Sequence, residues 1–230
     1  MTRFHTPAPG LAPWQAALAD PEKHWKDGKS AKELARSWVA AERTERGLPP
    51  KVAALLDTDP ALAGATLLFG IPEHKVELTS PGRPSQNDLW AILRTDAGLV
   101  SMTVEGKSGE PFDRTIGEWL KDASPGKVER LRGLCQLLDA PGDAPPGLRY
   151  QLFHRTASAI IEAKRWGITT AVMVVHSFGG KADEEGRRDY EAFGDWLGMT
   201  MGVVRSRRIP SRIELNLGWV PDTAVSAALE

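Results

Sequence analysis

The feature that most constrains the fold is a continuous apolar segment, TTAVMVVHS at residues 169–177, that follows an amphipathic segment at 148–166. An unbroken Val-rich run is typical of a strand buried on both faces, as in the parallel part of a sheet. The preceding segment repeats Phe153, Ala157 and Ile160 at helical spacing and predicts a long helix. Because a helix that joins two strands of one sheet makes a right-handed crossover, strand 169–177 should run parallel to an earlier strand.

That earlier strand is expected in a β-meander before the helix. Three segments read as strands separated by turn residues, at 75–80, 88–95 and 99–107. We expect the last of them, LVSMTVEGK, to lie beside strand 169–177. Further elements are predicted as helices at 115–123, 126–140 and 183–198 and a strand at 212–220. The order predicts an α/β fold with a mixed sheet flanked by helices.

The first third of the chain has a different sequence pattern from the rest. Residues 1–72 are predicted to form an N-terminal helical extension that precedes an α/β core at residues 73–230. Ser30, followed by Glu33, has the pattern of a capping box that opens a helix at 30–45. A short helix is predicted at 51–56, and the segment before residue 30 is expected to be irregular.

Composition narrows the functional classes. The formal net charge of the 230 residues is −1, so any contact with nucleic acid must come from a local basic patch. The single cysteine, Cys135, excludes an internal disulfide and reads as a small buried side chain rather than a nucleophile. No apolar run approaches the ~20 residues that span a bilayer, and the first residues lack the apolar centre of a signal peptide. We therefore expect a cytoplasmic protein with no membrane partner.

Glu105 and Lys107 close the apolar strand 99–107 and share one of its faces, because side chains alternate along a strand. Four segments of this chain have the pattern of an acid, any residue and a lysine, so the pattern alone does not identify a functional site. Only Glu105-Gly106-Lys107 ends an apolar strand of a predicted hairpin. Context therefore selects this pair as the candidate site.

The hairpin that contains this strand brings a second acid to it. If it closes symmetrically around Asp96 and Ala97, then Asp88 lies opposite Glu105. Directly opposed residues stand about 5 Å apart at Cβ, and two carboxylates that close repel each other unless a cation lies between them. A bulge at Gly98 would instead shift the register by one and separate the two carboxylates.

Asp88 at the start of a strand, a turn, a strand ending in Glu105-Gly106-Lys107, a helix and a buried strand together resemble the PD-(D/E)XK nuclease superfamily. The resemblance covers roughly residues 75–177. It implies a restriction-endonuclease-like core made of a helix, a three-strand meander, a helix and a strand. The chain departs from the family pattern at Asn87, where the family has a variable proline.

The resemblance also implies a chemistry, the metal-dependent hydrolysis of phosphodiester bonds. Asp88, Glu105 and the backbone carbonyl of Gly106 would bind Mg²⁺ or Mn²⁺, and carboxylates are ligands that Mg²⁺ prefers. Lys107 would orient the attacking water and stabilise the developing negative charge. Nucleic acid, most simply DNA, would be the substrate, and such nucleases often act as homodimers.

The helix at 148–166 supplies two further candidates. Gln151 and Arg155 lie in its N-terminal half, which should lie beside the carboxyl end of strand 99–107. Together with Ser158 and Glu162 they form a polar stripe. Two interpretations stay open: a supporting role for Gln151 and Arg155 in the site, or an ordinary solvated helix face.

Other polar residues have plainer interpretations. Glu77 is expected to be an exposed strand residue rather than a third acid, and Glu110 and Asp113 to cap a turn rather than bind a second metal. His176 is expected to be structural. A basic patch, the best candidate for phosphate contact, is formed by Arg205, Arg207, Arg208 and Arg212.

These observations favour a metal-dependent nuclease. The alternative is a catalytically silent protein of the same fold that binds nucleic acid or a protein partner. An unrelated α/β enzyme has no positive support, because the sequence contains no GxSxG, Walker, HExxH or paired CxxC motif.

Overall fold

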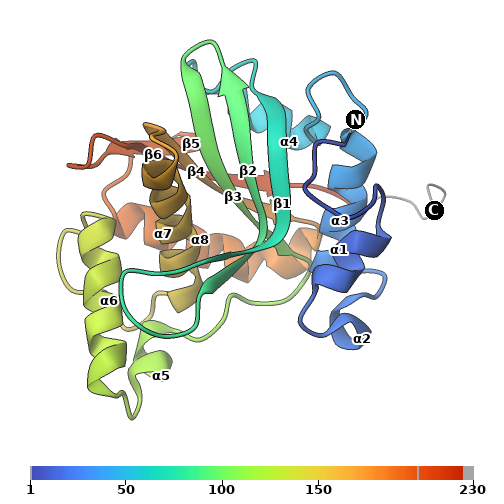
Figure 1. Ribbon diagram of the computed structural model, residues 1–230. Coiled ribbons are helices and arrows are strands. Elements are labelled where there is room, and N and C mark those ends of the chain that lie inside the picture. Colours follow the sequence, from blue (N-terminus) through green and yellow to red (C-terminus); the bar gives the residue numbers. More distant parts are fainter. Residues whose placement is uncertain (1, 201, 225–230) are drawn as a thin grey trace.

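The chain folds around a six-stranded mixed sheet with helices on both faces, as Figure 1 shows for the computed structural model, which describes residues 2–200 and 202–224. The α/β class expected from the sequence is confirmed. The strands lie in the order β1-β2-β3-β4-β6-β5. Their bounds are β1 Thr66–Val76, β2 Ser85–Thr95, β3 Gly98–Lys107, β4 Thr170–Ser177, β5 Val204–Arg208 and β6 Glu214–Pro221.

The first half of the sheet is the predicted meander. Strands β1, β2 and β3 pair antiparallel in chain order. The crossover through α7 (Tyr150–Arg165) then places β4 parallel to β3, as predicted. The sheet is completed by β6, which is parallel to β4, and by β5, which is antiparallel to β6 at the edge.

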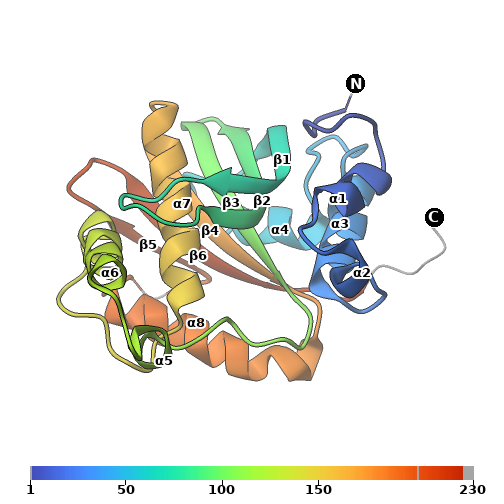
Figure 2. The same ribbon diagram turned by 60° about the horizontal axis from the view of Figure 1, so that its bottom comes forward.

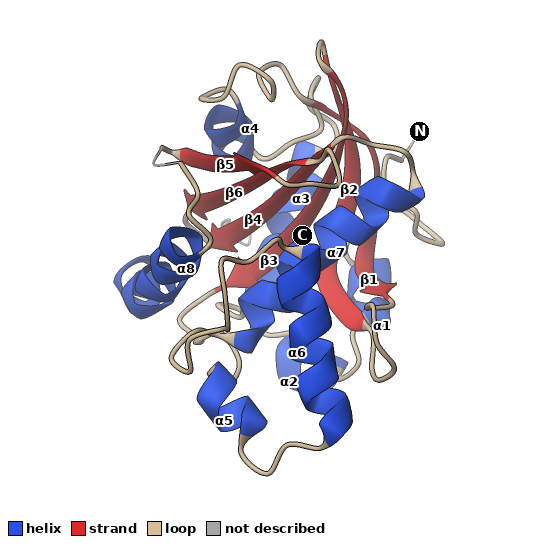
Figure 3. Cartoon of the chain, turned by 90° about the vertical axis from the view of Figure 1, so that its left-hand side faces the viewer, coloured by secondary structure: helices blue, strands red, loops and turns tan. Residues whose placement is uncertain are grey.

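Helices cover the sheet in two layers. The N-terminal layer packs on one face through a core that includes Leu34, Trp38 and Val52. It consists of α1 (Ala12–Ala17), α2 (Pro21–His24), α3 (Ser30–Ala41) and α4 (Pro50–Leu56). The opposite layer consists of α5 (Ile116–Leu120), α6 (Pro125–Leu137), α7, the 3₁₀ turn η1 (Gly180–Asp183) and α8 (Glu184–Trp196). Figure 2 shows the two layers on either side of the strands, and Figure 3 shows α6 and α7 in front of them.

Helix α7 is attached to the sheet by hydrogen bonds as well as by apolar contacts. The Ser101 hydroxyl donates to the carbonyl of Ala159 at 3.0 Å, and the Thr103 hydroxyl donates to the carbonyl of Arg155 at 3.1 Å. The indole N–H of Trp90 in turn donates to the Ser101 hydroxyl at 3.1 Å. All of these groups are buried, so each hydrogen bond fixes the position of α7 over β2 and β3.

The prediction for the first strand is wrong in its bounds. The strand is β1, Thr66–Val76, and it shares only Lys75 and Val76 with the predicted segment 75–80. It contains Gly70 and Pro72 and does not alternate cleanly, which hides it from pattern reading; proline is tolerated because β1 lies at the sheet edge. The sheet thus begins before residue 73, where we had expected the α/β core to start.

The other differences are smaller. Strand β5 was not predicted, because its sequence VRSRR is highly charged, as edge strands often are. The segment before residue 30 contains the short helices α1 and α2 rather than irregular chain only. The remaining predicted helices and strands are present with shifted ends. Within the described part of the chain, no helix has both the length and the apolar character needed to cross a membrane.

Replacing Ser101 by Ala should loosen α7, because it leaves the buried indole N–H of Trp90 and the carbonyl of Ala159 without partners. We expect the free energy of unfolding to fall by about 1–3 kcal/mol, measured by urea denaturation. Ser211→Ala, at an exposed position, serves as the control and should change it by less than about 0.5 kcal/mol. Equal effects of the two substitutions would contradict this account of α7.

Candidate functional site

The site is built where the meander ends and α7 begins. In the β2–β3 hairpin, Leu89 pairs with Val104 and Thr95 with Gly98, which is the predicted register. Asp88 and Glu105 are the next residues beyond the last pair. The backbone N–H of Gly106 donates to Asp88 Oδ2 at 2.8 Å, so the Asp88 carboxylate occupies the position where a further strand partner would lie.

Glu105 is the centre of the site, and its side chain is almost completely buried. Lys107 Nζ lies 2.9 Å from Glu105 Oε1, and Gln151 Nε2 donates to the same oxygen at 2.6 Å. Arg155 Nε donates to the other oxygen, Oε2, at 2.5 Å. Burial alone would raise the pKa of Glu105, but the charges of Arg155 and Lys107 outweigh it and lower the pKa to about 2. Glu105 is therefore a fixed anion.

Asp88 has the opposite electrostatic situation. Arg155 NH2 lies 3.9 Å from Asp88 Oδ1, and the Asp88 side chain is 20% exposed. Burial raises the pKa of Asp88 well above its usual range, and the carboxylates of Glu105 and Glu73 raise it further. A protonated or metal-bound carboxyl is thus favoured here over a free carboxylate.

Glu73 is a third acid of the site that the sequence analysis missed. Pro72 pairs with Leu89 and His74 with Asn87, so Glu73 lies opposite Asp88 across β1 and β2. Its backbone is in the left-handed region with φ 53°, a conformation that non-glycine residues rarely adopt and that often marks functional sites.

The environment of Glu73 resembles that of Asp88. Burial raises the pKa of Glu73 to about 7, against the opposing effect of Gln86, whose Nε2 donates to Glu73 Oε2 at 2.6 Å. Glu73-His74-Lys75 was one of the four segments with the acid and lysine pattern. It was set aside because only Glu105-Gly106-Lys107 ends an apolar strand of the predicted hairpin, and the first strand was expected to begin only at residue 75, after Glu73.

The predicted pair on α7 is brought to the site. Gln151 Oε1 accepts from Lys107 Nζ at 3.1 Å, while its amide N–H₂ group binds Glu105 as described above. Arg155 contacts Glu105 and also donates to the Ser85 hydroxyl at 3.2 Å, which lies 2.8 Å from His154 Nδ1. A network on β2, β3 and α7 therefore holds the Glu105 carboxylate in one orientation.

The alternative interpretation of the α7 polar stripe as a solvated face is wrong. Ser158 and Glu162 are buried. Glu162 accepts from Arg165 at 2.7 Å and lies 3.2 Å from His74 Nε2. His74 of β1 thus contacts this face of α7, and it lies outside the segment 75–80 that was expected to form the strand.

A pocket of about 560 Å³ opens over the three acids. Its inner side is formed by polar residues of the sheet and α7, together with Glu110 of the following loop. Its outer side is formed by the N-terminal layer. The inner residues are Glu73, Gln86, Asp88, Glu105, Gln151 and Arg155, and the outer ones are Leu18, Ala19, Lys23, His24, Lys29, Ser30 and Ala31.

Gly106 lies between Asp88 and the start of α3. A Cβ atom at this position would lie 3.4 Å from Asp88 Oδ2 and 3.4 Å from the carbonyl oxygen of Ser30. These are ordinary van der Waals distances, so the start of α3 lies directly against the end of β3 at this residue. The middle residue of Glu105-Gly106-Lys107 therefore links the N-terminal layer to the site.

The donor set suits a hard divalent cation in its chemistry. Within the described residues, no group of three His, Cys, Asp or Glu side chains is already arranged as a metal site. Three carboxylates, of Glu73, Asp88 and Glu105, nevertheless face two cations, Lys107 and Arg155, and two of the three have a raised pKa. Carboxylates that lack enough compensating positive charge are ligands that Mg²⁺ and Mn²⁺ accept.

The predicted arginine patch is not part of this site. Arg205 and Arg207 lie on β5, separated from β3 by β4 and β6. Arg205 NH1 is 2.5 Å from Asp195 and Arg207 NH2 is 2.8 Å from Asp139, so the charges of both are already paired. Arg208 ends the same strand, and Arg212 follows in the turn before β6.

The plainer interpretations of other acids and histidines hold. Glu77 is exposed and lies just beyond β1. Glu110 accepts from the backbone N–H of Ser108 at 3.2 Å, as expected of a turn-capping residue, although it also lines the pocket. His176 is buried on the opposite face of the sheet, 3.0 Å from Asp222 Oδ2.

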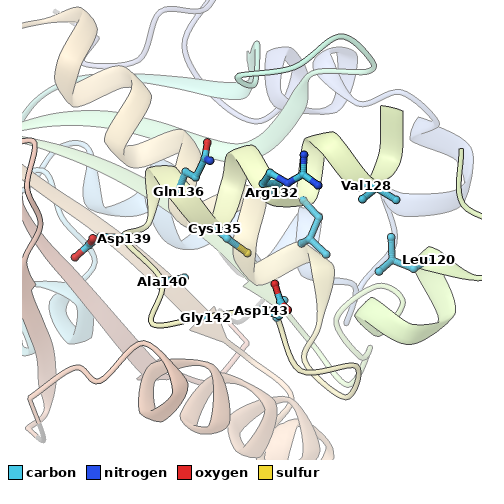
Figure 4. Close-up of a pocket in the computed structure, with 11 residues that line it drawn as sticks. Leu120, Val128, Arg132, Cys135, Gln136, Asp139, Ala140, Gly142 and Asp143 are labelled. Atoms are coloured by element: carbon cyan, nitrogen blue, oxygen red, sulfur yellow. The ribbon is translucent and has the colours of Figure 1, made fainter. Parts of the chain in front are cut away.

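Cys135 lines a different pocket, between α6 and residues 139–144 (Figure 4). Burial raises the pKa of the Cys135 thiol, and the negative charge of Asp143 raises it further. The thiol therefore stays protonated, in agreement with the expectation that Cys135 is not a nucleophile.

The comparisons with known proteins assign a family but no activity. The family model of a domain of unknown function, DUF6946, matches residues 7–224, which include both helical layers and the whole sheet. Neither the curated proteins nor the solved structures gave a match.

Removing the charge of Glu105 and removing that of Asp88 should have opposite effects on the free energy of unfolding. Glu105→Gln leaves Arg155 and Lys107 without their buried counter-ion and should lower the free energy of unfolding by about 3–5 kcal/mol. Asp88→Asn removes a carboxyl whose ionisation is disfavoured and should raise it by roughly 1 kcal/mol at neutral pH. Urea denaturation of both variants measures the two changes. If Asp88→Asn destabilised the protein as much as Glu105→Gln, this expectation would be contradicted.

Glu73 should make the protein less stable as pH rises. Its pKa of about 7 in the folded chain exceeds the ordinary value of 4.5, so the folded state keeps a proton that the unfolded state has lost. The stabilisation is complete below about pH 4.5 and is lost as pH rises through 7. We expect Glu73→Gln to reduce the fall in unfolding free energy between pH 5 and pH 8 by roughly 1–3 kcal/mol.

Urea denaturation at the two pH values measures this difference. Glu77→Gln, the exposed acid on the same segment, provides the matched control and should keep the pH dependence of the unsubstituted protein. If Glu73→Gln also keeps it, the buried carboxyl does not titrate in this range.

Proposed function

The chain belongs to the DUF6946 family, whose function is unknown, and from the geometry of its site we propose that it is a metal-dependent nuclease that hydrolyses phosphodiester bonds. We also propose that α3, the β1–β3 meander, α7 and β4 form a restriction-endonuclease-like core. These elements follow one another in the order that the PD-(D/E)XK superfamily shares. The cytoplasm remains its expected location.

One observation carries the proposal. Glu105 and Lys107 close β3 with 2.9 Å between Lys107 Nζ and Glu105 Oε1, and Asp88 lies across the hairpin with its carboxylate on the N–H of Gly106. An acid pair and a buried lysine at the end of one hairpin form the constellation that this hydrolysis uses. Burying these charged groups is unfavourable for the free energy of folding, and a catalytic role explains why they are buried nevertheless.

Asp88, Glu105 and the backbone carbonyl of Gly106 are the residues that would hold Mg²⁺ or Mn²⁺. When bound, the cation would polarise a phosphate oxygen and lower the pKa of bound water. Lys107 would orient the attacking water and balance the charge that develops on the phosphate. Glu105 is held for this purpose by Gln151 and Arg155, which act as positioning residues.

A second candidate is a catalytically silent protein of this fold that binds nucleic acid or a protein partner. The specific observation in its favour is that both oxygens of Glu105 are already engaged by donors of the protein itself. Such a cluster can serve stability and specificity of the fold without any metal ion.

Cleavage of plasmid DNA, single-stranded DNA and RNA with Mg²⁺ or Mn²⁺ tests the first candidate. We expect Asp88→Asn and Lys107→Met to reduce the rate by at least about 10²-fold, because each removes a group that acts on the reacting phosphate. Chelation of the metal by EDTA should abolish cleavage. Glu77→Gln should cleave like the unsubstituted protein.

Calorimetry with Mn²⁺ distinguishes the two candidates. The nuclease should bind the ion, and Asp88→Asn should lose this binding. Cleavage that survives in both Asp88→Asn and Lys107→Met would show that the site is assigned wrongly. A protein that binds oligonucleotide but neither binds metal nor cleaves would be the silent form. Size-exclusion chromatography of the same samples tests whether the chain forms a homodimer, as the resemblance to the superfamily implies.

A further inference from the structure

We propose that the basic residues at the outer rim of the pocket, Lys23, His24 and Lys29, form a binding surface for the phosphate backbone of a nucleic acid. We call these three residues the basic rim. The inference rests on the proposed function and deepens it, because it identifies where the polymer lies and makes the N-terminal layer part of substrate binding. It also replaces the arginine patch at 205–212 as the predicted phosphate contact.

The two sides of the pocket have opposite charge. The inner side presents the acids Glu73, Asp88 and Glu105, which by themselves would repel a phosphodiester. The basic rim faces the same space from the opposite layer. A polyanion can therefore approach the acids only if positive charge at the entrance offsets the repulsion, and the basic rim is placed to do this.

The cations of the basic rim are available for a ligand. Lys23, His24 and Lys29 are exposed, and within residues 2–200 and 202–224 neither lysine forms an ion pair. The neighbouring acid, Asp27, is instead paired with Lys32 and Arg36 at 2.8 Å each. Asp27 therefore does not cancel the positive charge of the basic rim, and the two other acids near it, Asp20 and Glu22, do not line the pocket.

The segment that carries the basic rim is fastened to the catalytic strand. The Ser108 hydroxyl, just after Lys107, donates to the carbonyl of Gly28 at 2.7 Å. The N–H of Gly28 donates to Glu33 Oε1 at 2.8 Å, which ties the loop to α3. In Figure 1 this blue N-terminal layer lies beside the end of the sheet where β3 leaves it. The basic rim is therefore held at a defined position relative to the acids.

Phosphate backbone fits this surface better than an acidic protein would. The basic rim lies along one side of a pocket that holds the acids on its other side, so a phosphodiester can enter the pocket while the rest of the polymer stays on the basic rim. The exposed basic residues lie on the outer side of the pocket, opposite the acids, so they contact phosphates flanking the reacting one. Contacts of this kind position a nucleic acid without reading its sequence.

Binding of fluorescein-labelled oligonucleotides to the full chain in EDTA tests the inference without cleavage. Single-stranded and duplex DNA and RNA are compared by fluorescence anisotropy over a range of salt concentrations. Lys23→Ala/Lys29→Ala should weaken binding about tenfold at low salt and reduce the slope of log affinity against log salt by about two. Both lysines are exposed, so thermal unfolding should be unchanged.

A matched control removes the same charge elsewhere. Lys121→Ala/Lys164→Ala changes two exposed lysines that do not line the pocket, and it should bind like the unsubstituted protein. Equal binding by the basic-rim variant and the control would overturn the inference, as would absence of binding by the unsubstituted protein. Equal binding of labelled polyglutamate would overturn it too, because the surface would then select negative charge in general.

The outcome is independent of the cleavage test. If the basic rim proves necessary for binding but no substrate is cut, the inference stands and the nuclease proposal fails. If Asp88→Asn abolishes cleavage while the basic-rim variant binds normally, the nuclease proposal stands and this inference fails.

Discussion

The buried carboxylate of Glu105 is the interaction on which the rest of the structure depends. Its two oxygens accept hydrogen bonds from Lys107 of the same strand and from Gln151 and Arg155 of α7. An anion this deeply buried is tolerated only when its partners are fixed. The crossover helix must therefore lie with its N-terminal half on the end of β3, and the hydrogen bonds of Ser101 and Thr103 extend the same attachment toward the other end of the helix.

The surroundings of the acids separate their behaviour. Arg155 and Lys107 lower the pKa of Glu105, whereas burial and neighbouring carboxylates raise those of Asp88 and Glu73. Titratable groups whose environments drive their pKa values apart are typical of acid–base and metal sites. Here the separation follows from one asymmetry, since both cations of the inner side lie next to Glu105. The remaining two acids face an open pocket whose outer side is basic.

Some features of the fold and of the site were predictable from the sequence, and others were not. The apolar run at 169–177 and the hairpin around Asp96 predicted the parallel crossover and the register that juxtaposes Asp88 and Glu105. Gln151 and Arg155 were placed correctly because helix direction follows from the crossover. Glu73 was missed because Gly70 and Pro72 obscure its strand. The ion pairs of Arg205 with Asp195 and of Arg207 with Asp139 could not be foreseen, because charge density in a sequence does not tell which partners are near.

The sequence by itself determined the local features: the strand and helix periodicities, the turn of the β2–β3 hairpin and the two-residue spacing of Glu105 and Lys107. These depend on neighbours within one element or one hairpin, where alternation and turn geometry leave few choices. Only the tertiary structure decided that the N-terminal layer closes the pocket with Lys23 and Lys29, and that Glu73 joins the acids. Both depend on contacts between segments far apart in the chain, which packing against the whole sheet selects and no local pattern encodes.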